Sequence, residues 1–400
     1  MDAELRSPLK PIFVVGGLYS EANGVARIMR GLAAALGRAG TPVTVYGAEC
    51  FGRKSIGHIF ELPSRWASTR GFWLGGLSWS PRLKGMLRDG IRQADVVHNH
   101  SIWMLPNSYS SRIASSAKKP VVITAHGTLE RWAVQHSRWK KRVAGLLFQD
   151  QELHAADCIH VNSEAEIDGV RAYGLKCPVA VIPNGIDLPD LDALPSASVF
   201  RQAFPATRDK KIALFMARLH VKKGLEHLLR AWAQLHCGFP GWHLVIAGPD
   251  RGFGRRAHQL VDEFQLNQSV TFTGHLQGHA RLAALSAAEV FLHPSFSEGF
   301  SMAVLEALAC RLPSLITAGC NFREASIAGA AIEVSPDTDS TMEGLRELLS
   351  ATDEQRSAMG QQGRALIERA YTWDGVAQQT LDLYRWLAGG GERPATVVDG

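Results

Sequence analysis

Short apolar runs that alternate with helical stretches are the feature that most constrains the fold of this sequence, and they occur in two series. The first series has apolar runs at 11–17, 44–47, 94–100, 120–127, 157–163 and 179–185, with a helical pattern over 24–40. The second series has runs at 210–219, 242–250, 269–276, 288–295 and 312–319, with helical patterns over 224–236 and 255–264. Continuous apolar strands between helices are typical of parallel sheets covered on both faces. The sequence therefore predicts an α/β fold with two doubly wound, Rossmann-like domains.

The length of the chain also indicates two domains, because 400 residues exceed what one hydrophobic core usually holds. Periodicity is lost over 187–198, where prolines and aspartates gather, so we place the boundary after residue 190. The expected domains are then 1–190 and 191–372, and the glycine-rich end at 389–400 is expected to be disordered. Ligands of such sheets bind at the carboxyl ends of the strands, so substrates are expected in a central cleft that the two domains face.

Cysteine usage and the N-terminus predict a cytoplasmic protein. The six cysteines are scattered and form no C-x-x-C pair, which fits reduced thiols better than a disulfide framework or a zinc site. The N-terminal apolar run is too short for a signal peptide, and no stretch is apolar enough to predict a membrane span. Residues 1–190 hold 23 Lys and Arg against 16 Asp and Glu. That surplus indicates either an anionic partner or an ordinary basic surface.

The stretch HPSFSEGFSMAVLEALACRLP (293–313) carries two glutamates, Glu298 and Glu306, in an otherwise apolar segment. Glu298 follows an apolar strand and precedes a predicted helix N-terminus, whose unpaired N–H groups favour anions. Glu306 would lie about 12 Å further along the axis if the helix extends over both glutamates. The two carboxylates could then accept hydrogen bonds from hydroxyls at the two ends of an elongated ligand, with a phosphate between them. A nucleotide sugar has this layout of sugar hydroxyls, diphosphate and ribose diol.

Together with segments elsewhere in the chain, this stretch resembles the E-x7-E signature of the retaining GT-B glycosyltransferases of family GT4. The resemblance extends in order over nearly the whole chain. It includes Gly16-Gly17 followed by residues 23–25, the Thr-Ala-His-Gly segment at His126, residues 183–187, and the Arg218-x4-Lys223-Gly sequence. The segment 371–387 resembles the family's C-terminal helix, which crosses back to the first domain and which we place at 373–388. Ser301 and Arg311 depart from the pattern, since glycines are common at both positions.

The resemblance implies a role for each matching residue. Glu306 would bind the ribose hydroxyls, and Glu298 would bind the hydroxyls of the donor sugar. Arg218 and Lys223 would bind the diphosphate and offset the negative charge that develops on the leaving group. His126 would lie beside the donor sugar, near the reacting carbon.

Further donor contacts are implied for small and aromatic residues in the same motifs. Gly16 and Gly17 would let a loop approach the phosphates and the acceptor. The remaining implied donor contacts follow Glu298 directly and are Gly299, Phe300 and Ser301.

The activity implied by the resemblance is transfer of a sugar from a nucleotide-sugar donor to a glycan or lipid-linked acceptor, with retention of configuration, in polysaccharide biosynthesis. Residues 1–190 would form the acceptor side and residues 191–372 the donor side. We expect no cofactor and no metal, since the nucleotide sugar is a substrate, and no nucleic acid among the partners. A nucleotide-sugar 2-epimerase on the same fold and a non-catalytic nucleotide-sugar-binding protein are the alternatives.

Each of these site residues also has a purely structural interpretation. Glu306 can form a structural salt bridge, because an unpaired buried carboxylate is costly. Glu298 can be a solvated loop carboxylate, and Arg218 and Lys223 can belong to an ordinary basic loop. His126 can be a hydrogen-bonded core histidine.

Two short patterns resemble metal-binding motifs but have better explanations. His98 and His100 form an H-x-H pair without an obvious third ligand, so we interpret them as strand-end residues that line the cleft. The sequence Asp337-Thr-Asp339 resembles a D-x-D metal motif. It follows a strand-like segment at the far end of the second domain, so a turn or a helix cap is the preferred interpretation.

The segment 131–153 mixes five basic residues with two tryptophans and several large apolar side chains. A helix of this composition can lie on an anionic membrane surface, which would make the protein peripheral on the inner face of the membrane. A solvated helix over the first domain's core explains the composition equally well, so both interpretations stay open.

Overall fold

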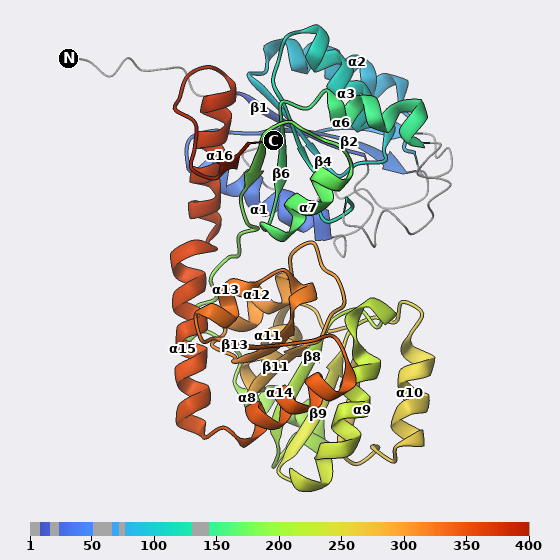
Figure 1. Cartoon of the computed structure of the whole chain (residues 1–400), viewed down its shortest axis with the longest axis vertical. Coiled ribbons are helices and arrows are strands. Elements are labelled where there is room, and N and C mark those ends of the chain that lie inside the picture. Colours follow the sequence, from blue (N-terminus) through green and yellow to red (C-terminus); the bar gives the residue numbers. More distant parts are fainter. Residues whose placement is uncertain (1–8, 17–23, 51–65, 72–76, 130–143, 400) are drawn as a thin grey trace, which may run out of the picture. The chain divides into compact units, whose positions relative to one another are not determined.

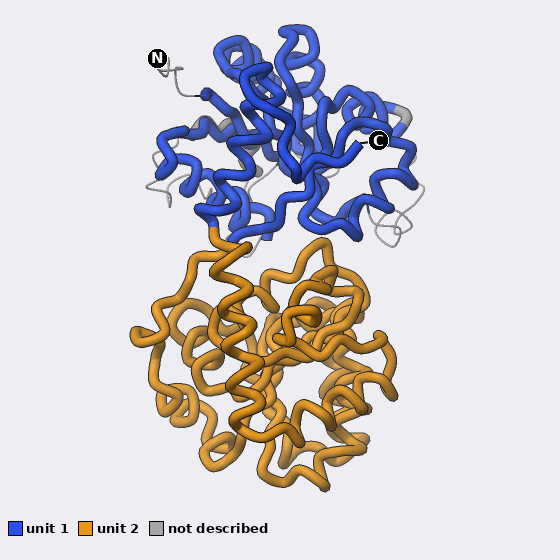
Figure 2. Tube along the Cα trace, turned by 60° about the vertical axis from the view of Figure 1, so that its left-hand side comes forward, with its two compact units in different colours: residues 1–185, 373–400 blue, residues 186–372 orange. Residues whose placement is uncertain are grey.

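The computed structural model describes residues 9–16, 24–50, 66–71, 77–129 and 144–399, which divide into two compact units. Unit 1 lies within residues 1–185 and 373–400, and unit 2 comprises residues 186–372 (Figure 2). Each unit has a parallel sheet with helices on both faces, so the prediction of two doubly wound α/β domains is confirmed.

The chain passes from unit 1 to unit 2 after Gly185 rather than after residue 190. Ile186 already belongs to unit 2, because its N–H donates to the carbonyl of Tyr371 (2.9 Å) and it forms a β-bridge with Thr372. Its side chain is buried in the core of unit 2. The segment rich in proline and aspartate, which suggested the boundary in the sequence, is therefore the first part of unit 2.

In its described residues, unit 1 has an eight-stranded sheet in the order β14-β7-β6-β5-β4-β1-β2-β3 (Figure 1). The strands are β1 (Pro11–Val15), β2 (Thr44–Cys50), β3 (Trp66–Gly71), β4 (Val96–His100), β5 (Val121–Thr124), β6 (Cys158–Val161), β7 (Val179–Val181) and β14 (Val397–Val398). Neighbours pair in parallel except β14, which is antiparallel to β7. Strands β1, β4 and β5 are buried along their whole length, as expected when helices cover both faces.

Helices cover both faces of this sheet because successive strand residues point to opposite sides. Phe13 faces α1 (Gly24–Arg38) and α16 (Trp373–Leu387) in one buried cluster. Its neighbour Val14 belongs to the cluster on the other face. That cluster includes residues of α2 (Pro81–Gln93), α3 (Leu105–Ser116), α6 (Asp150–His154) and α7 (Ala165–Ala172), and α6 is preceded by the π-helical turn η2 (Gly145–Gln149).

Helix α16, which corresponds to the segment expected to cross back, is part of unit 1 and packs beside α1. The ring of Trp373 occupies the space where Gly31 and Gly185 lack side chains, since a Cβ at either glycine would lie within 2.6 Å of it. Arg38 of α1 forms an ion pair with Asp374 of α16 (2.7 Å). The last helix is thereby attached to the first unit by packing and by charge.

Residues 389–399 are ordered against unit 1, so the prediction of a disordered tail was wrong. Val397 pairs with Ala180 of β7 and is buried, and Arg393 forms an ion pair with Asp399 (2.8 Å). This pairing covers the edge of the sheet, whose backbone groups would otherwise be open to other strands. Two valines in a glycine-rich segment are too short a pattern for periodicity to identify.

Unit 2, all of whose residues are described, has a six-stranded parallel sheet in the order β10-β9-β8-β11-β12-β13. The strands are β8 (Lys211–Met216), β9 (Trp242–Ala247), β10 (Val270–Gly274), β11 (Val290–His293), β12 (Ser314–Thr317) and β13 (Ala331–Val334). One buried cluster contains residues of α8 (Ala197–Ala203), α11 (Gly278–Ala287), α12 (Met302–Ala309), α13 (Arg323–Ile327) and α15 (Asp353–Ala370). The cluster on the other face contains residues of α9 (Leu225–Leu235), α10 (Gly254–Glu263) and α14 (Thr338–Ser350).

Candidate functional site

Two loops at the carboxyl ends of adjacent strands β8 and β11 meet in unit 2. The loop after β8 contains a 3-10 turn (Val221–Lys223) that ends at Gly224, which has a left-handed φ of 66°. A Cβ at Gly224 would lie 1.8 Å from the carbonyl oxygen of Pro294 in the loop after β11, so only glycine allows this approach. Phe296 N–H and the Ser295 hydroxyl both donate to the carbonyl of Lys222 (2.8 and 3.0 Å). The His-Pro-Ser segment is thereby fixed against the lysine turn.

This close approach brings Lys223 and Glu298 together as an ion pair, with only 12% and 14% of their side chains exposed. The imidazole of His293, at the end of β11, lies 3.1 Å from the same carboxylate oxygen, Oε1. Burial alone would raise the pKa of Glu298, but the Lys223 ammonium and the His293 hydrogen bond outweigh it and hold this pKa well below its ordinary value. Glu298 is therefore ionised, and its Oε2 has no hydrogen-bond partner among the described residues. That oxygen can accept from a ligand hydroxyl.

Backbone contacts hold Glu298 in place independently of its side chain. Its N–H donates to the carbonyl of Gly319 (2.7 Å), and its own carbonyl accepts from the side-chain amide of Asn321 (2.6 Å). Asn321 has a left-handed φ of 52°, a conformation that asparagine tolerates better than most residues. The loop after β12 thus supports the loop after β11. His293 and Asn321 were not predicted as site residues, because nothing in the sequence distinguishes them from other strand-end polar residues.

Glu306 lies inside α12, is 5% exposed, and forms an ion pair with Arg281 of α11. The structural salt bridge considered as an alternative therefore exists, and a ligand role for Glu306 remains a prediction. Helix α12 begins at Met302, so Glu298 lies in the preceding loop and the two glutamates do not share one helix. The spacing of 12 Å along a common axis does not apply for that reason.

The other unit 2 residues of the predicted site lie near this cluster in the chain but differ in environment. Arg218 lies two residues after the end of β8 and is exposed, without an ion pair among the described residues. Phe300 stacks on Tyr371 and packs at a tilted angle against Phe322, with ring centroids 5.8 and 5.1 Å apart, so its side chain packs against the core. Ser301 is buried and precedes α12, but its side chain makes no capping hydrogen bond. Gly299 connects Glu298 to this segment and is partly buried.

In unit 1, His126 lies at the carboxyl end of β5 beside a cluster of histidines from β4 and β6. Its φ is 51°, a left-handed conformation that is rare for residues other than glycine and that tends to occur at functional sites. His126 Nε2 lies 3.4 Å from His100 Nδ1, and burial lowers the pKa of His126 to about 3. Its Nδ1 and the Nε2 of His100 are buried without a hydrogen-bond partner in the described structure. The histidine is partly buried, and its Nδ1 is an unsatisfied nitrogen that a ligand could use.

A directional chain of hydrogen bonds passes through the same strands. The carbonyl of Ile182 can only accept, so His160 Nε2–H donates to it (2.8 Å) and His160 Nδ1 must accept from the Thr124 hydroxyl (2.7 Å). Thr124 in turn accepts from His98 Nε2 (2.6 Å), and His98 Nδ1 accepts from the hydroxyl of Tyr384 on α16 (2.6 Å). The tautomers of His98 and His160 are fixed by this chain. Both histidines are neutral, because burial lowers the pKa of His160 to about 4 and places that of His98 well below its usual range.

The H-x-H pair does not form part of a metal centre in the described residues, which contain no group of three or more His, Cys, Asp or Glu arranged to hold an ion. His98 and His100 stack at 4.2 Å between ring centroids and are buried strand residues. Asp337 is the N-cap of α14 and accepts from Ser340 N–H (2.8 Å). The interpretation of Asp337 as a helix cap is confirmed.

Gly16 and Glu166 shape the loops at the same end of the unit 1 sheet. A Cβ at Gly16 would lie 2.3 Å from Met104, so the missing side chain admits the segment before α3. Glu166 was not predicted as a site residue, yet its buried carboxylate accepts from the N–H groups of Gly127 (3.0 Å) and Asn162 (2.9 Å). It therefore ties the loop after β5 to the loop after β6. Gly17 lies outside the described residues, and the role predicted for the two glycines remains a prediction.

Solved structures share this fold. A sucrose-phosphate synthase from Thermosynechococcus elongatus is 24% identical, covers 95% of this chain and 99% of its own, and superposes with a TM-score of 0.72. Alr3699/HepE of Anabaena, solved in complex with UDP, is 18% identical with a TM-score of 0.73, over 94% of this chain and 99% of its own. These likenesses show that the fold is the GT-B fold.

Sequence comparison gives the family. Residues 197–366 match the glycosyl transferases group 1, and residues 22–189 match Glycosyltransferase Family 4. A D-inositol 3-phosphate glycosyltransferase of Kineococcus radiotolerans is 26% identical over 328 residues, which are 75% of this chain and 74% of that protein. The chain belongs to the GT4 family of glycosyltransferases. No helix among the described residues is long and apolar enough to cross a bilayer.

Proposed function

We propose that this protein transfers a sugar from a nucleoside diphosphate donor to a glycan or lipid-linked acceptor in polysaccharide biosynthesis, with retention of configuration and without a metal ion. The observation that carries the proposal is the cluster of Lys223, Glu298 and His293 at the ends of β8 and β11. It places a fixed cation and an ionised carboxylate side by side in a largely buried position. Such a pair suits a ligand in which sugar hydroxyls adjoin a diphosphate.

In this proposal Glu298 binds hydroxyls of the donor sugar through its available oxygen, while Lys223 and Arg218 bind the diphosphate. Breaking the sugar–phosphate bond leaves additional negative charge on the departing nucleoside diphosphate. A preorganised cation at that point stabilises the transition state more than the ground state, and loss of one such group typically costs about 10²–10³ in rate. Lys223 is preorganised because the turn ending at Gly224 and the Glu298 carboxylate both hold it.

If Glu306 binds the ribose diol of the donor, Arg281 must either share the Glu306 carboxylate with the ribose hydroxyls or move away from it. A carboxylate has room for several hydrogen bonds, so Arg281 can keep Glu306 ionised while the second oxygen accepts from a hydroxyl. We therefore propose Glu306 as the ribose ligand and Arg281 as the residue that orients it. The UDP bound by HepE supports a nucleoside diphosphate as the ligand class for this fold.

Retention is proposed to proceed by front-face attack, with the departing phosphate assisting as base. His126 is assigned to the sugar because its backbone is strained and because its Nδ1 is buried without a hydrogen-bond partner in the described structure. Glu166 at the same strand ends is a poor nucleophile, because two backbone N–H groups already occupy its carboxylate. The inositol phosphate in the name of one relative supports a hydroxyl acceptor in general, and the acceptor of this chain is proposed to be a glycan or a lipid-linked acceptor.

A peripheral position on the inner face of the membrane belongs to the same proposal, since a lipid-linked acceptor would be presented there. The basic, tryptophan-containing segment proposed to bind that surface, residues 131–148, lies mostly outside the described residues. Its mixture of cationic and aromatic side chains supports the proposal.

The test combines ligand binding with product analysis. A panel of UDP-, GDP- and ADP-sugars is screened by thermal shift, in which a donor present at 100 times its Kd stabilises the fold by about 2.7 kcal/mol. The stabilising donor is then incubated with candidate acceptors in EDTA, and the anomeric configuration of the product is read by NMR. Stabilisation without any transfer would favour a binding protein, and release of a 2-epimer of the donor would favour an epimerase. An inverted product would refute the proposed stereochemistry.

A further inference from the structure

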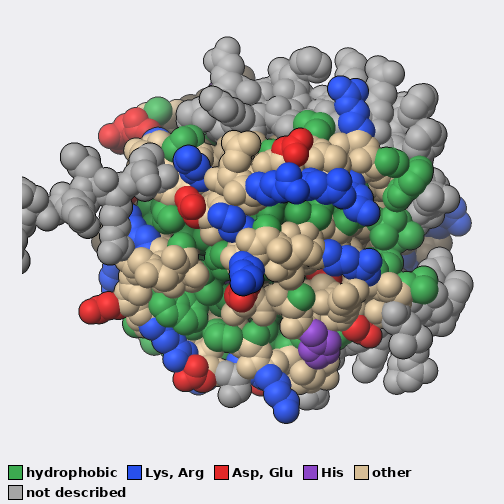
Figure 3. All heavy atoms as spheres, turned by 90° about the horizontal axis from the view of Figure 1, so that it is seen from above, with side chains coloured by type: hydrophobic (Ala, Val, Ile, Leu, Met, Phe, Trp, Pro, Cys, Tyr) green, Lys and Arg blue, Asp and Glu red, His purple; other side chains and the backbone are tan. Residues whose placement is uncertain are grey.

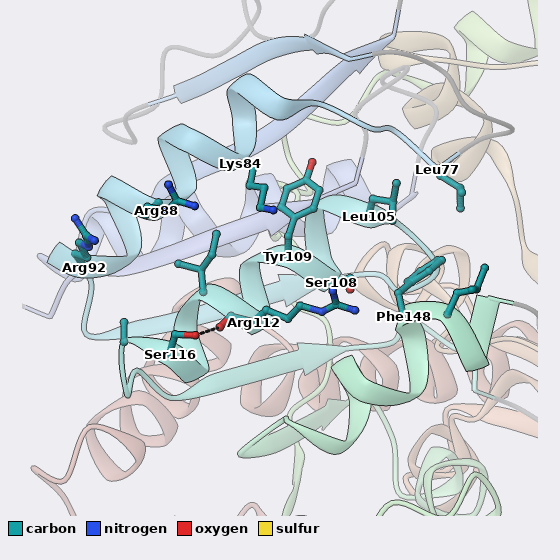
Figure 4. Close-up of a pocket in the computed structure, with 13 residues that line it drawn as sticks. Leu77, Lys84, Arg88, Arg92, Leu105, Ser108, Tyr109, Arg112, Ser116 and Phe148 are labelled. Carbon is teal, nitrogen blue, oxygen red and sulfur yellow. Dashed lines mark hydrogen bonds between the residues drawn. The ribbon is translucent and has the colours of Figure 1, made fainter.

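A groove runs between α2 and α3 of unit 1, on the face of the sheet opposite to α1 and α16. Its volume is about 650 Å³. The described residues that line it are Leu77, Lys84, Arg88, Arg92, Leu105, Ser108, Tyr109, Arg112, Ile113, Ser116, Ala117, Leu147 and Phe148 (Figure 4). Four of these residues are cationic and none is acidic. No residue of this groove takes part in the site described above.

The cations of α2 form a straight row along the groove. Lys84, Arg88 and Arg92 are four residues apart, so they share one face of the helix and span about 12 Å. Figure 4 shows the three side chains following one another along α2, with Lys84 beside the ring of Tyr109. Like charges at this spacing destabilise a helix. Three in succession indicate that the row serves a purpose other than helix stability.

The row lacks an ion-pair partner in the described structure, although Asp89 lies on the same helix. Lys84, Arg88 and Arg92 form no ion pair with any described residue, and all three are exposed. Arg112 on α3 faces the buried carboxyl of Glu152, but burial raises the pKa of that carboxyl to about 8, so the group is largely uncharged at neutral pH. The groove therefore keeps most of its positive charge.

One end of the groove is apolar. Leu77, Leu105 and Phe148 lie together there, away from Arg88 and Arg92 (Figure 4). Leu147 on the adjacent turn η2 also lines the groove, and 69% of it is exposed, so the apolar end is open to a ligand. Seen from above, the molecule shows a row of Lys and Arg side chains bordered by hydrophobic ones (Figure 3). The same groove thus offers cations for an anionic group and an apolar surface next to it.

We propose that this groove binds a single phosphate-bearing lipid. Its phosphate group lies between the α2 row and Arg112, and its aliphatic part covers Leu77, Leu105, Leu147 and Phe148. A concave groove of this volume encloses one molecule, whereas a flat basic patch would suit a bilayer surface. The site is separate from the donor chemistry and would hold a lipid whether or not that lipid is the acceptor.

The test uses the full-length protein without nucleotide sugar, so its outcome does not depend on the proposed transfer. Dihexanoyl phosphatidic acid, kept below its critical micelle concentration, is titrated by calorimetry at low salt. Dihexanoyl phosphatidylcholine and inorganic phosphate are titrated in parallel. We expect saturable one-to-one binding of phosphatidic acid, and at least tenfold weaker binding of both comparison ligands, because each lacks either the net charge or the chain.

Matched variants locate the site. Each cation near an anionic lipid contributes about fivefold in affinity, so Arg88→Gln with Arg92→Gln should weaken binding about 25-fold. Arg82→Gln removes the same charge from α2 outside the groove and should change affinity less than twofold. Leu147→Ser should weaken phosphatidic acid about tenfold while leaving inorganic phosphate unchanged. Circular dichroism of each variant excludes loss of fold, since all these residues are exposed.

Three outcomes would overturn the proposal. Equal affinity for inorganic phosphate and phosphatidic acid would mean that the apolar end contributes nothing. If Arg82→Gln weakened binding as much as the Arg88/Arg92 double variant does, binding would depend on the general positive charge of the surface and not on the groove. Binding to phosphatidylglycerol vesicles without any binding of the soluble lipid would identify a membrane-surface patch instead of a one-lipid site.

Discussion

The buried histidines of unit 1 should make that unit unstable in mild acid. At a pH between the ordinary histidine pKa and the lowered pKa of the native state, each such histidine is protonated in the unfolded chain but neutral in the native state. Unfolding is therefore favoured as the pH falls below about 6.5. Burial lowers the pKa of His126 to about 3 and of His160 to about 4, and lowers those of His98 and His100 well below the usual range.

The change in the free energy of unfolding follows from the pKa of each group in the unfolded chain and its pKa in the native state. Between pH 7.5 and pH 5 one such histidine reduces the free energy of unfolding by about 2 kcal/mol, and four reduce it by about 8 kcal/mol. Glu152 acts in the opposite sense, because burial raises its pKa to about 8 and its native protonated form is favoured as the pH falls. Over the same interval it restores about 3 kcal/mol, which leaves a net loss of about 5 kcal/mol. This is a large part of the stability of an ordinary domain.

The variant His160→Gln removes the contribution of one histidine to this loss of stability. The glutamine amide can still donate to the Ile182 carbonyl, and its oxygen can accept from the Thr124 hydroxyl, but the side chain cannot be protonated. Urea unfolding at pH 7.5, 6 and 5 measures stability, and hydrogen exchange of the β4–β6 amides assigns the transition to unit 1. We expect the variant to lose about 2 kcal/mol less than the wild type between pH 7.5 and 5.

The matched control is His258→Gln, which replaces an exposed histidine of unit 2 by the same residue. It should leave the pH dependence of unit 1 as in the wild type. Identical acid sensitivity of the His160 variant and the wild type would refute the reasoning. Unchanged protection of the β4–β6 amides down to pH 5 would do so as well, since it would mean that the cluster is not the acid-sensitive element.

Three further predictions concern unit 2 and the C-terminus. Lys223→Ala should lower turnover about 10²–10³-fold, measured as product formation at saturating donor. Turnover of the wild type should change by no more than about twofold when EDTA is added. An enzyme inactivated by EDTA and reactivated by Mn²⁺ would contradict this prediction. Glu306→Gln should raise the KM for the donor, whereas Glu298→Gln should mainly lower kcat, and equal wild-type kinetics in either variant would reject its assignment. Truncation after residue 388 removes β14 and should lower the melting temperature of unit 1 by several degrees, because β7 loses its antiparallel partner; an unchanged transition would show that the pairing adds no stability.

The fold was predictable because the signals that define it are local. Most strands of the two sheets are short apolar runs, and a helical pattern or a loop separates each from the next. Strand β3 contains Ser, Thr and Arg, so the sequence did not predict it. The boundary and the tail were misplaced because their evidence is tertiary. Ile186 belongs to unit 2 because it contacts residues 371 and 372. Val397 pairs with β7, which lies more than two hundred residues earlier in the chain.

The site was predictable only in part, for the same reason. Glu298 and Lys223 were found because family motifs surround them, and the structure pairs them across 75 residues. Asn321, Arg281 and Glu166 support that site or its counterpart in unit 1, but each meets its partner only after folding. No spacing in the sequence relates Arg281 on α11 to Glu306 on α12.

The pairing of both glutamates with cations explains how an apolar segment can carry two carboxylates. Removing one partner of a buried ion pair leaves the other charge uncompensated and typically costs about 3–5 kcal/mol, whereas a neutral isostere of similar shape leaves a hydrogen-bonding group in place. Glu298→Ala would remove the ion-pair partner of Lys223 and the hydrogen-bond partner of His293, so a loss of activity could result from a displaced loop rather than from lost chemistry. Glutamine also leaves the Lys223 charge uncompensated, but it retains an acceptor for both neighbours. A fall in kcat for Glu298→Gln, with an unchanged melting temperature, would therefore assign the carboxylate to the chemistry of transfer rather than to the stability of unit 2.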